Sequence, residues 1–185
     1  MLMFELIANI AGLIIKASWL MLPAYLANPT AVVFGGGTPI DFKKNWSDGR
    51  RIFGDGKTFR GLIGGTACGV AAGLIQMQVT SLQYLGTFTM IAIFMLSFGA
   101  LLGDLTKSFF KRRLGYERGA KFPLVDQLDF VAGAWILTYA FDPTWFSYNF
   151  LTSPWIMVIV VLFTPLLHRL TNIIGYYSGL KKEPW

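Results

Sequence analysis

The feature that most constrains this chain is a stretch of 43 residues, 61–103, in which no side chain carries a charge. As one α-helix it would be about 65 Å long, roughly twice the thickness of a bilayer core. It therefore has to fold as two apolar segments joined by a turn. Polar residues suited to that turn lie near its middle, at Gln76, Gln78, Thr80, Ser81 and Gln83.

The composition excludes an ordinary soluble domain. Hydrophobic residues make up 54% of the 185 residues and charged residues 14%, against about 25% charged in a typical soluble protein. The net charge of +6 does not indicate nucleic-acid binding, because apolar runs separate the basic residues. With Cys68 as the single cysteine, an internal disulfide or a cysteine metal cluster is excluded.

We predict an all-α, polytopic membrane protein with one domain, 1–185. Its five transmembrane helices are expected at about 4–27, 61–79, 84–104, 124–142 and 154–175. The fourth is unusual, because only 12 uncharged residues lie between Asp129 and Asp142, about 18 Å of helix. To span the bilayer core, this helix must also include residues from 122–129, which places Asp126 and Asp129 at or below the membrane surface.

The basic residues predict the orientation. Six lie in 28–60, six in 104–129 and three beyond residue 168, whereas the turns near 76–83 and 142–153 carry none. Five spans place all three basic segments on one face, which the positive-inside rule makes cytoplasmic. We therefore expect the N-terminus outside the cell membrane and two substantial cytoplasmic loops, about 28–60 and 105–123.

Three basic residues in the second loop, Arg113, Arg118 and Lys121, are expected only to set this orientation. Lys16 lies mid-span and is expected to snorkel to an interface or to pair with a carboxylate. His168, near a helix end, is expected to contact headgroups or to cap the helix.

The segment that follows the third span carries a polar face. If the helix continues beyond the membrane, Asp104, Lys107, Ser108 and Lys111 share one side of it. A carboxylate beside a hydroxyl and two ammonium groups suits a metal-bound polyphosphate. The alternative is that these lysines touch anionic lipid headgroups.

Asp126 and Asp129 form the strongest constellation. Their i, i+3 spacing puts two carboxylates on one side of a helix near a low-dielectric region, where they repel each other. A bound Mg²⁺ would relieve this repulsion, and it commonly uses one or two carboxylates together with substrate phosphates. The alternative is that both acids complement the helix dipole.

The first loop contains a glycine turn, Gly54-Asp55-Gly56-Lys57-Thr58, that leads into a helix. A P-loop ATPase is excluded, because its pattern needs a glycine where this chain has Arg51. The turn can still bind phosphate through backbone N–H groups, Lys57 and Thr58, or it can be an ordinary turn. Glycines at four-residue spacing follow, and they permit helix packing or line a lipid groove: Gly61, Gly65, Gly69 and Gly73.

Two sets of motifs resemble a known family. The first resembles the C-terminal signature of the CTP:phosphatidate cytidylyltransferases: Gly103-Asp104-x-x-Lys107-Ser108-x-x-Lys111-Arg112, then Asp126-x-x-Asp129. The second is similar to the archaeal branch, the CDP-archaeol synthases: Thr38-Pro39-Ile40-Asp41 and Gly54-Asp55-Gly56-Lys57-Thr58-x-Arg60-Gly61. The bacterial signature has a longer glycine-rich stretch where this chain has residues 121–125, and an arginine where it has Gln127.

The resemblance implies the reaction. CTP and an ether-lipid phosphate with two geranylgeranyl chains would give CDP-archaeol and pyrophosphate, with Mg²⁺ and without nucleic acid. The expected metal ligands are Asp104, Asp126 and Asp129. The residues expected to be catalytic are Asp126, Asp129 and Lys111. The remaining residues expected to bind CTP or the lipid phosphate are Lys57, Thr58, Arg60, Lys107, Ser108, Arg112, Asp41, Asn45 and Asp55.

Two other classes compete with this interpretation. A CDP-alcohol phosphotransferase would carry an Asp-Gly-x-x-Ala-Arg motif, but after Asp48-Gly49 this chain lacks the Ala-Arg pair. A small transporter would distribute charges along a path across the membrane, whereas the outer half of the predicted spans is almost uncharged.

Overall fold

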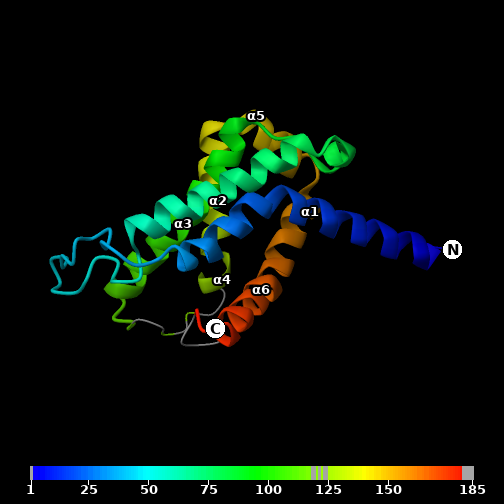
Figure 1. Cartoon of the computed structure of the whole chain (residues 1–185). Helices are drawn as coiled ribbons and strands as arrows, with labels where there is room; N and C mark the ends of the chain where they lie inside the picture. Colours follow the sequence, from blue (N-terminus) through cyan, green and yellow to red (C-terminus); the bar gives the residue numbers. More distant parts are fainter. Residues whose placement is uncertain (1, 118–119, 121, 123–124, 181–185) are drawn as a thin grey trace.

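The computed structural model describes residues 2–117, 120, 122 and 125–180, and in these ranges it is helical without a strand. This confirms the all-α prediction. The elements, in chain order, are α1 (Leu2–Val33), α2 (Phe59–Gln78), η1 (Thr80–Leu85), α3 (Met90–Arg113), α4 (Val125–Phe141), α5 (Pro143–Phe146), η2 (Ser147–Leu151) and α6 (Pro154–Tyr177) (Figure 1).

Three helices in the described part of the chain are long and apolar enough to cross a membrane: Met3–Val33 of α1, α3 and α6. Of the other long helices, α2 has 20 residues and α4 has 17, and α4 would therefore be only about 25 Å long. Five crossings and the orientation of the N-terminus stay predictions.

Two helices continue past the predicted membrane borders. α1 runs through Pro23 and Pro29 to Val33, so the expected ordered turns occupy only the later part of the 28–60 segment. α3 extends to Arg113, and residues 105–113, expected in a loop, are helical. Charged residues limit a membrane span, but Lys and Arg are good helix formers and do not end a helix.

The glycine stripe of α2 serves helix packing. Gly65, Gly69 and Gly73 are buried, and a Cβ at Gly69 would lie 2.5 Å from the carbonyl oxygen of Pro23 and from Ser97 Oγ. The stripe therefore allows α2 to fit closely between α1 and α3. This confirms the packing interpretation over the lipid groove for these three residues.

A second glycine contact joins α3 to α4. A Cβ at Gly103 would overlap the backbone of Asp129, and a Cβ at Gly133 would overlap the backbone of Gly99 and Gly103. The spacing of Gly99 and Gly103 was visible in the sequence, but its partner helix was not. This contact brings Asp104, next to Gly103, beside Asp129.

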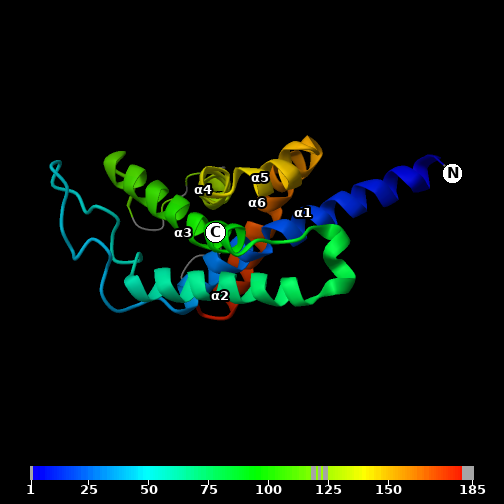
Figure 2. The same cartoon turned by 90° about the horizontal axis from the view of Figure 1, so that it is seen from above.

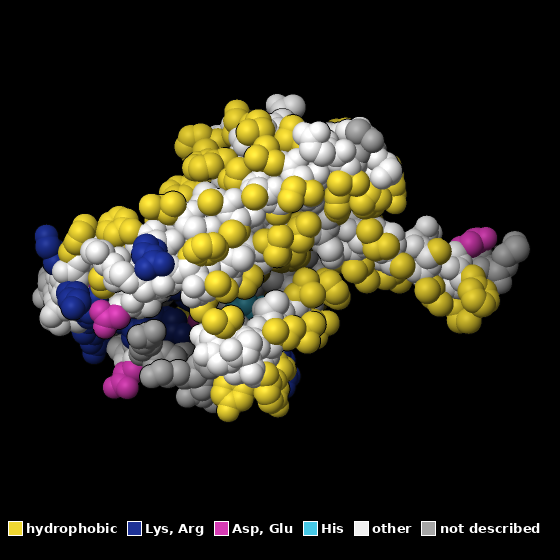
Figure 3. All heavy atoms as spheres, viewed as in Figure 1, with side chains coloured by type: hydrophobic (Ala, Val, Ile, Leu, Met, Phe, Trp, Pro, Cys, Tyr) yellow, Lys and Arg dark blue, Asp and Glu magenta, His cyan; other side chains and the backbone are white. Residues whose placement is uncertain are grey.

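The core lies between the two ends of the molecule. It is built from α1, α3, α4, α5, η2 and α6, and its largest fully buried hydrophobic side chains include Leu20, Met21, Ile93, Leu96 and Phe150. The loop between α1 and α2 extends from one end, while the N-terminal part of α1 projects from the other (Figures 1 and 2). Lysine, arginine and acidic side chains gather around that loop, on a surface that is otherwise largely hydrophobic (Figure 3).

Candidate active site

The first loop folds around the side chain of Asp41. Its Oδ1 accepts hydrogen bonds from Arg51 Nη2 (2.7 Å) and Lys43 N (3.1 Å). Its Oδ2 accepts bonds from Arg51 Nε (3.2 Å) and from the backbone N–H groups of Phe53 (3.0 Å) and Gly54 (2.9 Å). One buried carboxylate therefore holds both sides of the loop.

The environment of Asp41 stabilises its ionised form. Burial raises the pKa of this carboxyl, but the bonds from Arg51, Gly54, Phe53 and Lys43 outweigh burial and lower the pKa to about 2. The guanidinium of Arg51 in turn has a raised pKa, because it pairs with Asp41 and Asp55. Asp41 is thus ionised, with both oxygens engaged inside the loop.

Two arginines tie this loop to the C-terminal end of α3. Arg113 Nη1 binds Asp48 Oδ1 (2.8 Å), and Arg113 Nη2 donates to Arg51 O (2.6 Å). Arg50 Nη1 donates in the opposite direction, to Arg113 O (2.9 Å), and so satisfies a carbonyl at the helix end. Arg113, expected only to set orientation, therefore also holds the loop in place.

Three carboxylates converge on one ammonium group beneath the loop. Lys107 Nζ lies 2.9 Å from Asp104 Oδ1, 2.9 Å from Asp129 Oδ2 and 3.5 Å from Asp126 Oδ1. Lys57, from the glycine turn, also pairs with Asp104, and Lys111 Nζ pairs with Asp126 Oδ1 at 3.0 Å. We call these six residues the ion cluster.

The carboxylates of the ion cluster fit a hard divalent cation. In the described residues, no three potential ligands already form a metal site, because lysines lie between the acids. However, the Asp129 side chain is only 4% exposed, and its buried Oδ1 makes no hydrogen bond of ordinary length and angle with the described residues. An acceptor left unsatisfied in this way can coordinate an ion.

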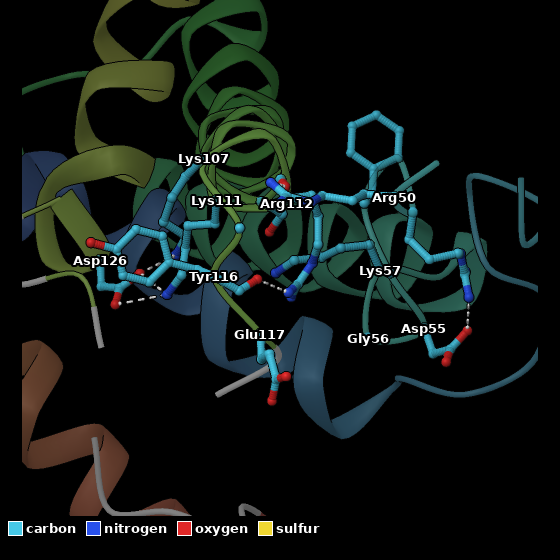
Figure 4. Close-up of a pocket in the computed structure, with 15 residues that line it drawn as sticks. Arg50, Asp55, Gly56, Lys57, Lys107, Lys111, Arg112, Tyr116, Glu117 and Asp126 are labelled. Carbon is cyan, nitrogen blue, oxygen red and sulfur yellow. Dashed lines mark hydrogen bonds and ion pairs between the residues drawn. The ribbon is translucent and has the colours of Figure 1, made fainter. Parts of the chain in front are cut away.

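A polar cavity of about 700 Å³ opens between the first loop and α3. Figure 4 shows Lys57 at this cavity from the loop, and Lys107, Lys111 and Arg112 from α3, while Asp55 lies at its edge. Cations on both sides make it suited to a polyphosphate.

A second cavity, of about 900 Å³, lies between the C-terminal end of α1, the start of α2, and α3, α4 and α6. Apolar residues such as Val32, Leu62, Leu101 and Ile173 contribute to its lining. The two cavities share part of their walls, formed by Gly56, Lys57, Lys107, Lys111 and Asp126. A charged patch therefore separates a polar space from a more apolar one.

Most of the predicted site residues come together here. Asp55, Ser108 and Arg112 line the polar cavity in addition to residues of the shared wall, Thr58 and Asp104 line the second cavity, and Asp129 lies behind Lys107. The hydroxyl of Thr58 accepts a hydrogen bond from Gly61 N (3.1 Å) and caps α2. Ser108 Oγ donates to Asp104 O (2.9 Å).

Three predicted binding residues line neither cavity. The Asp41 carboxylate is occupied within the loop, and Asn45 is exposed and forms an isolated β-bridge with Arg51. Arg60 instead lies against Gly37, where a Cβ would come 3.0 Å from Arg60 Cδ. Arg118 and Lys121 lie outside the described residues.

The structure adds residues that the motifs did not indicate. Arg50, Phe53, Tyr116 and Glu117 line the polar cavity, and no sequence pattern marked them. His168 lines the second cavity, where its ring stacks on Phe130 at 6.4 Å between centroids. A position in this cavity is compatible with the expected headgroup contact.

Comparison with known proteins decides the family. A family model described as CarS-like, CDP-archaeol synthase, matches residues 10–185. The chain belongs to the CDP-archaeol synthase family. This confirms the resemblance carried by the two sets of motifs and decides against both alternatives, the CDP-alcohol phosphotransferase and the small transporter.

Individual members of the CDP-archaeol synthase family agree over most of their length. The CDP-archaeol synthase of Methanosarcina mazei is 54% identical over 177 residues, and that of Methanospirillum hungatei is 55% identical over 168. Each alignment covers 89% of this chain and all of the relative.

A solved structure, described as an intramembrane enzyme for archaeal membrane lipid biosynthesis, is 42% identical. It matches with a TM-score of 0.72 over 86% of this chain and 94% of that one. Together with the three long apolar helices, this match identifies the chain as a membrane protein.

Proposed function

We propose that the two cavities divide the substrates of one reaction between them. The family assigns to this chain the CTP-dependent transfer of a cytidylyl group to a lipid phosphate, which gives CDP-archaeol. CTP would occupy the polar cavity, and the lipid phosphate would enter through the second cavity. The observation that carries the proposal is the shared wall, which would bring both phosphates to the same lysines.

Lys57, Lys111 and Arg112 would hold the triphosphate. They come from two segments that face each other across the polar cavity (Figure 4). A lipid phosphate oxygen, approaching from the second cavity, would attack the α-phosphorus of CTP in line with the departing pyrophosphate. No covalent intermediate with the protein is needed, so the protein contributes positioning and neutralisation of charge.

Mg²⁺ fits the carboxylates of the ion cluster. Asp104, Asp126 and Asp129 would hold it, and Asp129 Oδ1 offers a buried, unsatisfied oxygen. When bound, Mg²⁺ would withdraw negative charge from the phosphate oxygens of the nucleotide. Asp129 is buried beside Lys107 and lines neither cavity, whereas Asp126 lines both.

The second cavity suits the ether lipid. Its walls come from α1, α2, α3, α4 and α6, so two geranylgeranyl chains could extend along apolar helices while the phosphate meets Lys57 and Lys107. We further propose five membrane crossings, with the N-terminus outside and the active site facing the cytoplasm, as the distribution of basic residues predicts. In a Cys68→Ser background, the new thiol of Lys44→Cys should react with a membrane-impermeant thiol reagent only from the cytoplasmic side.

A direct assay tests the reaction. The purified protein is incubated with labelled CTP, Mg²⁺ and unsaturated archaeal ether-lipid phosphate, and both CDP-lipid and pyrophosphate are measured. We expect equal amounts of the two products and none without the lipid phosphate. Absence of CDP-lipid across a range of detergents and lipid mixtures would contradict the proposal.

A further inference from the structure

We propose that the ammonium group of Lys107 occupies the place that a divalent cation takes when CTP binds, and that Lys107 then moves onto the phosphates. Lys107 would thus be a resident counter-ion that preserves the metal site in the empty enzyme. This inference rests on the proposed function, because it assumes that the ion cluster receives a metal.

The geometry around Lys107 resembles an ion site rather than an ordinary salt bridge. Its Nζ lies within 3.5 Å of carboxylates from Asp104, Asp126 and Asp129, on two helices. Two of these distances, 2.9 Å, exceed the roughly 2.1 Å of a Mg²⁺–oxygen bond. A smaller, doubly charged ion at the same point would draw the carboxylates inward.

The ion cluster is formally neutral as it stands, with three aspartates and three lysines. Adding a divalent cation alone would leave two excess positive charges in a partly buried place, which is unfavourable. A triphosphate that arrives with the metal would remove that excess. Metal and nucleotide are therefore expected to bind together.

Lys107 has a route to the phosphates. It lines both cavities, and a lysine carries its charge on a flexible four-carbon stem with three rotatable donors. A permanent structural role for the Lys107–Asp129 pair fits less well, because Asp129 Oδ1 stays unsatisfied although it is buried.

Lys111 provides a matched control. It belongs to the same ion cluster and carries the same charge, but among the three carboxylates its ammonium pairs only with Asp126. If net charge alone governs metal affinity, then Lys107→Met and Lys111→Met will tighten metal binding equally. If Lys107 occupies the metal position, Lys107→Met will tighten it far more.

The test measures Mn²⁺ binding by electron paramagnetic resonance in the full-length protein, first without nucleotide. For Lys107→Met we expect at least about tenfold tighter binding than in the wild type, and for Lys111→Met less than about threefold. Thermal melting supplies a second readout: Lys107→Met should melt several degrees lower in EDTA and recover with Mn²⁺. The wild type should respond little to Mn²⁺ alone.

Equal affinity in the two variants, or a Lys107→Met melting temperature that ignores Mn²⁺, would overturn the inference while leaving the proposed function intact. If the wild type binds no Mn²⁺ even with CTP, the proposed metal site itself fails. Should Lys107→Met not fold, Lys107→Met with Asp126→Asn restores the charge balance. That double variant is compared with Lys111→Met carrying the same Asp126→Asn change, and the same difference in affinity is expected.

Discussion

The first loop and the ion cluster both join buried carboxylates to cations, yet they differ in how completely the oxygens are satisfied. Asp41 has two oxygens that together accept five hydrogen bonds from its own loop. Asp129 is equally hidden, but one of its oxygens has no hydrogen-bond partner in the described residues, and the other shares Lys107 with two more acids.

This difference in hydrogen bonding distinguishes a carboxylate with a structural role from one that can bind a ligand. A carboxylate whose bonds are all made stabilises a fold and has nothing left to offer a ligand. A carboxylate that is buried, crowded and incompletely bonded costs stability, and such costs are usually found at functional sites. Asp41 is therefore interpreted as the residue that organises the loop, and Asp129 as a carboxylate available to coordinate a metal ion.

The strongest test of this comparison is Asp129→Asn. The amide keeps the size of the side chain but removes the charge that would bind the cation. We expect turnover to fall by about 10²- to 10³-fold in a protein that keeps its helical content, measured by CDP-lipid formation and circular dichroism. Glu5→Gln, distant from both cavities, should retain full activity, and near-normal turnover in Asp129→Asn would refute the metal assignment.

Asp41→Asn should change the stability of the first loop rather than the chemical step. It removes the buried carboxylate that pairs with Arg51, which keeps only Asp55. It also removes an acceptor of backbone bonds, and together these losses should destabilise the loop by about 2 to 3 kcal/mol. Amides of residues 40–58 should then exchange faster, and KM for CTP should rise more than KM for the lipid. Lys44→Ala, an exposed change in the same turn, is the control. If kcat fell while the KM values and the amide hydrogen exchange of the loop stayed normal, Asp41 would instead have a role in the catalytic step.

The pH dependence of the loop gives a further test. The pKa of Asp41 is about 2 in the folded protein, against an ordinary value of 3.8, so the ionised carboxylate favours the folded loop. Its stabilisation is complete above about pH 5 and is lost as the pH falls from 4 towards 2, by about 2 kcal/mol. Hydrogen exchange in the loop at pH 6, 4 and 3 should show this loss in the wild type, and a smaller one in Asp41→Asn.

The smallest expected effect belongs to Arg113. Arg113→Met removes the bonds to Asp48 and to the loop carbonyls, worth about 1 kcal/mol in total at this partly exposed place. KM for CTP should rise about fivefold with little change in kcat, and Arg113→Lys should recover only part of it. An unchanged KM would show that the loop holds its position without the Arg113 side chain.

Part of the fold and of the candidate site could be predicted from single segments of the sequence. The uncharged stretch 61–103 required two helices, and α2 and α3 are both present. However, α2 includes Gln76 and Gln78 of the predicted turn, and α3 begins at Met90 rather than at residue 84, because η1 (Thr80–Leu85) lies between the two helices. The spacing of Asp104, Lys107 and Lys111 placed one polar face on α3, because helix geometry is local. The two sets of motifs, in the first loop and from Gly103 to Asp129, also identified the family, as the comparison confirmed.

Other features could not be predicted, because they depend on which helix meets which. That Lys107 faces Asp129 follows from Gly103 and Gly133, whose missing side chains let α3 and α4 approach closely. The engagement of Asp41 inside its own loop depends on backbone N–H groups, and residue types do not reveal where these point. The contribution of α6 to the second cavity likewise depends on tertiary packing.

The sequence by itself determined the helices, the gathering of charge and the family, since these depend on composition and on residues near one another along the chain. Only the tertiary structure decided which carboxylates are satisfied and which are not. That distinction depends on the distances between atoms of different helices, and it separates the acid that folds the loop from the acids offered to the metal.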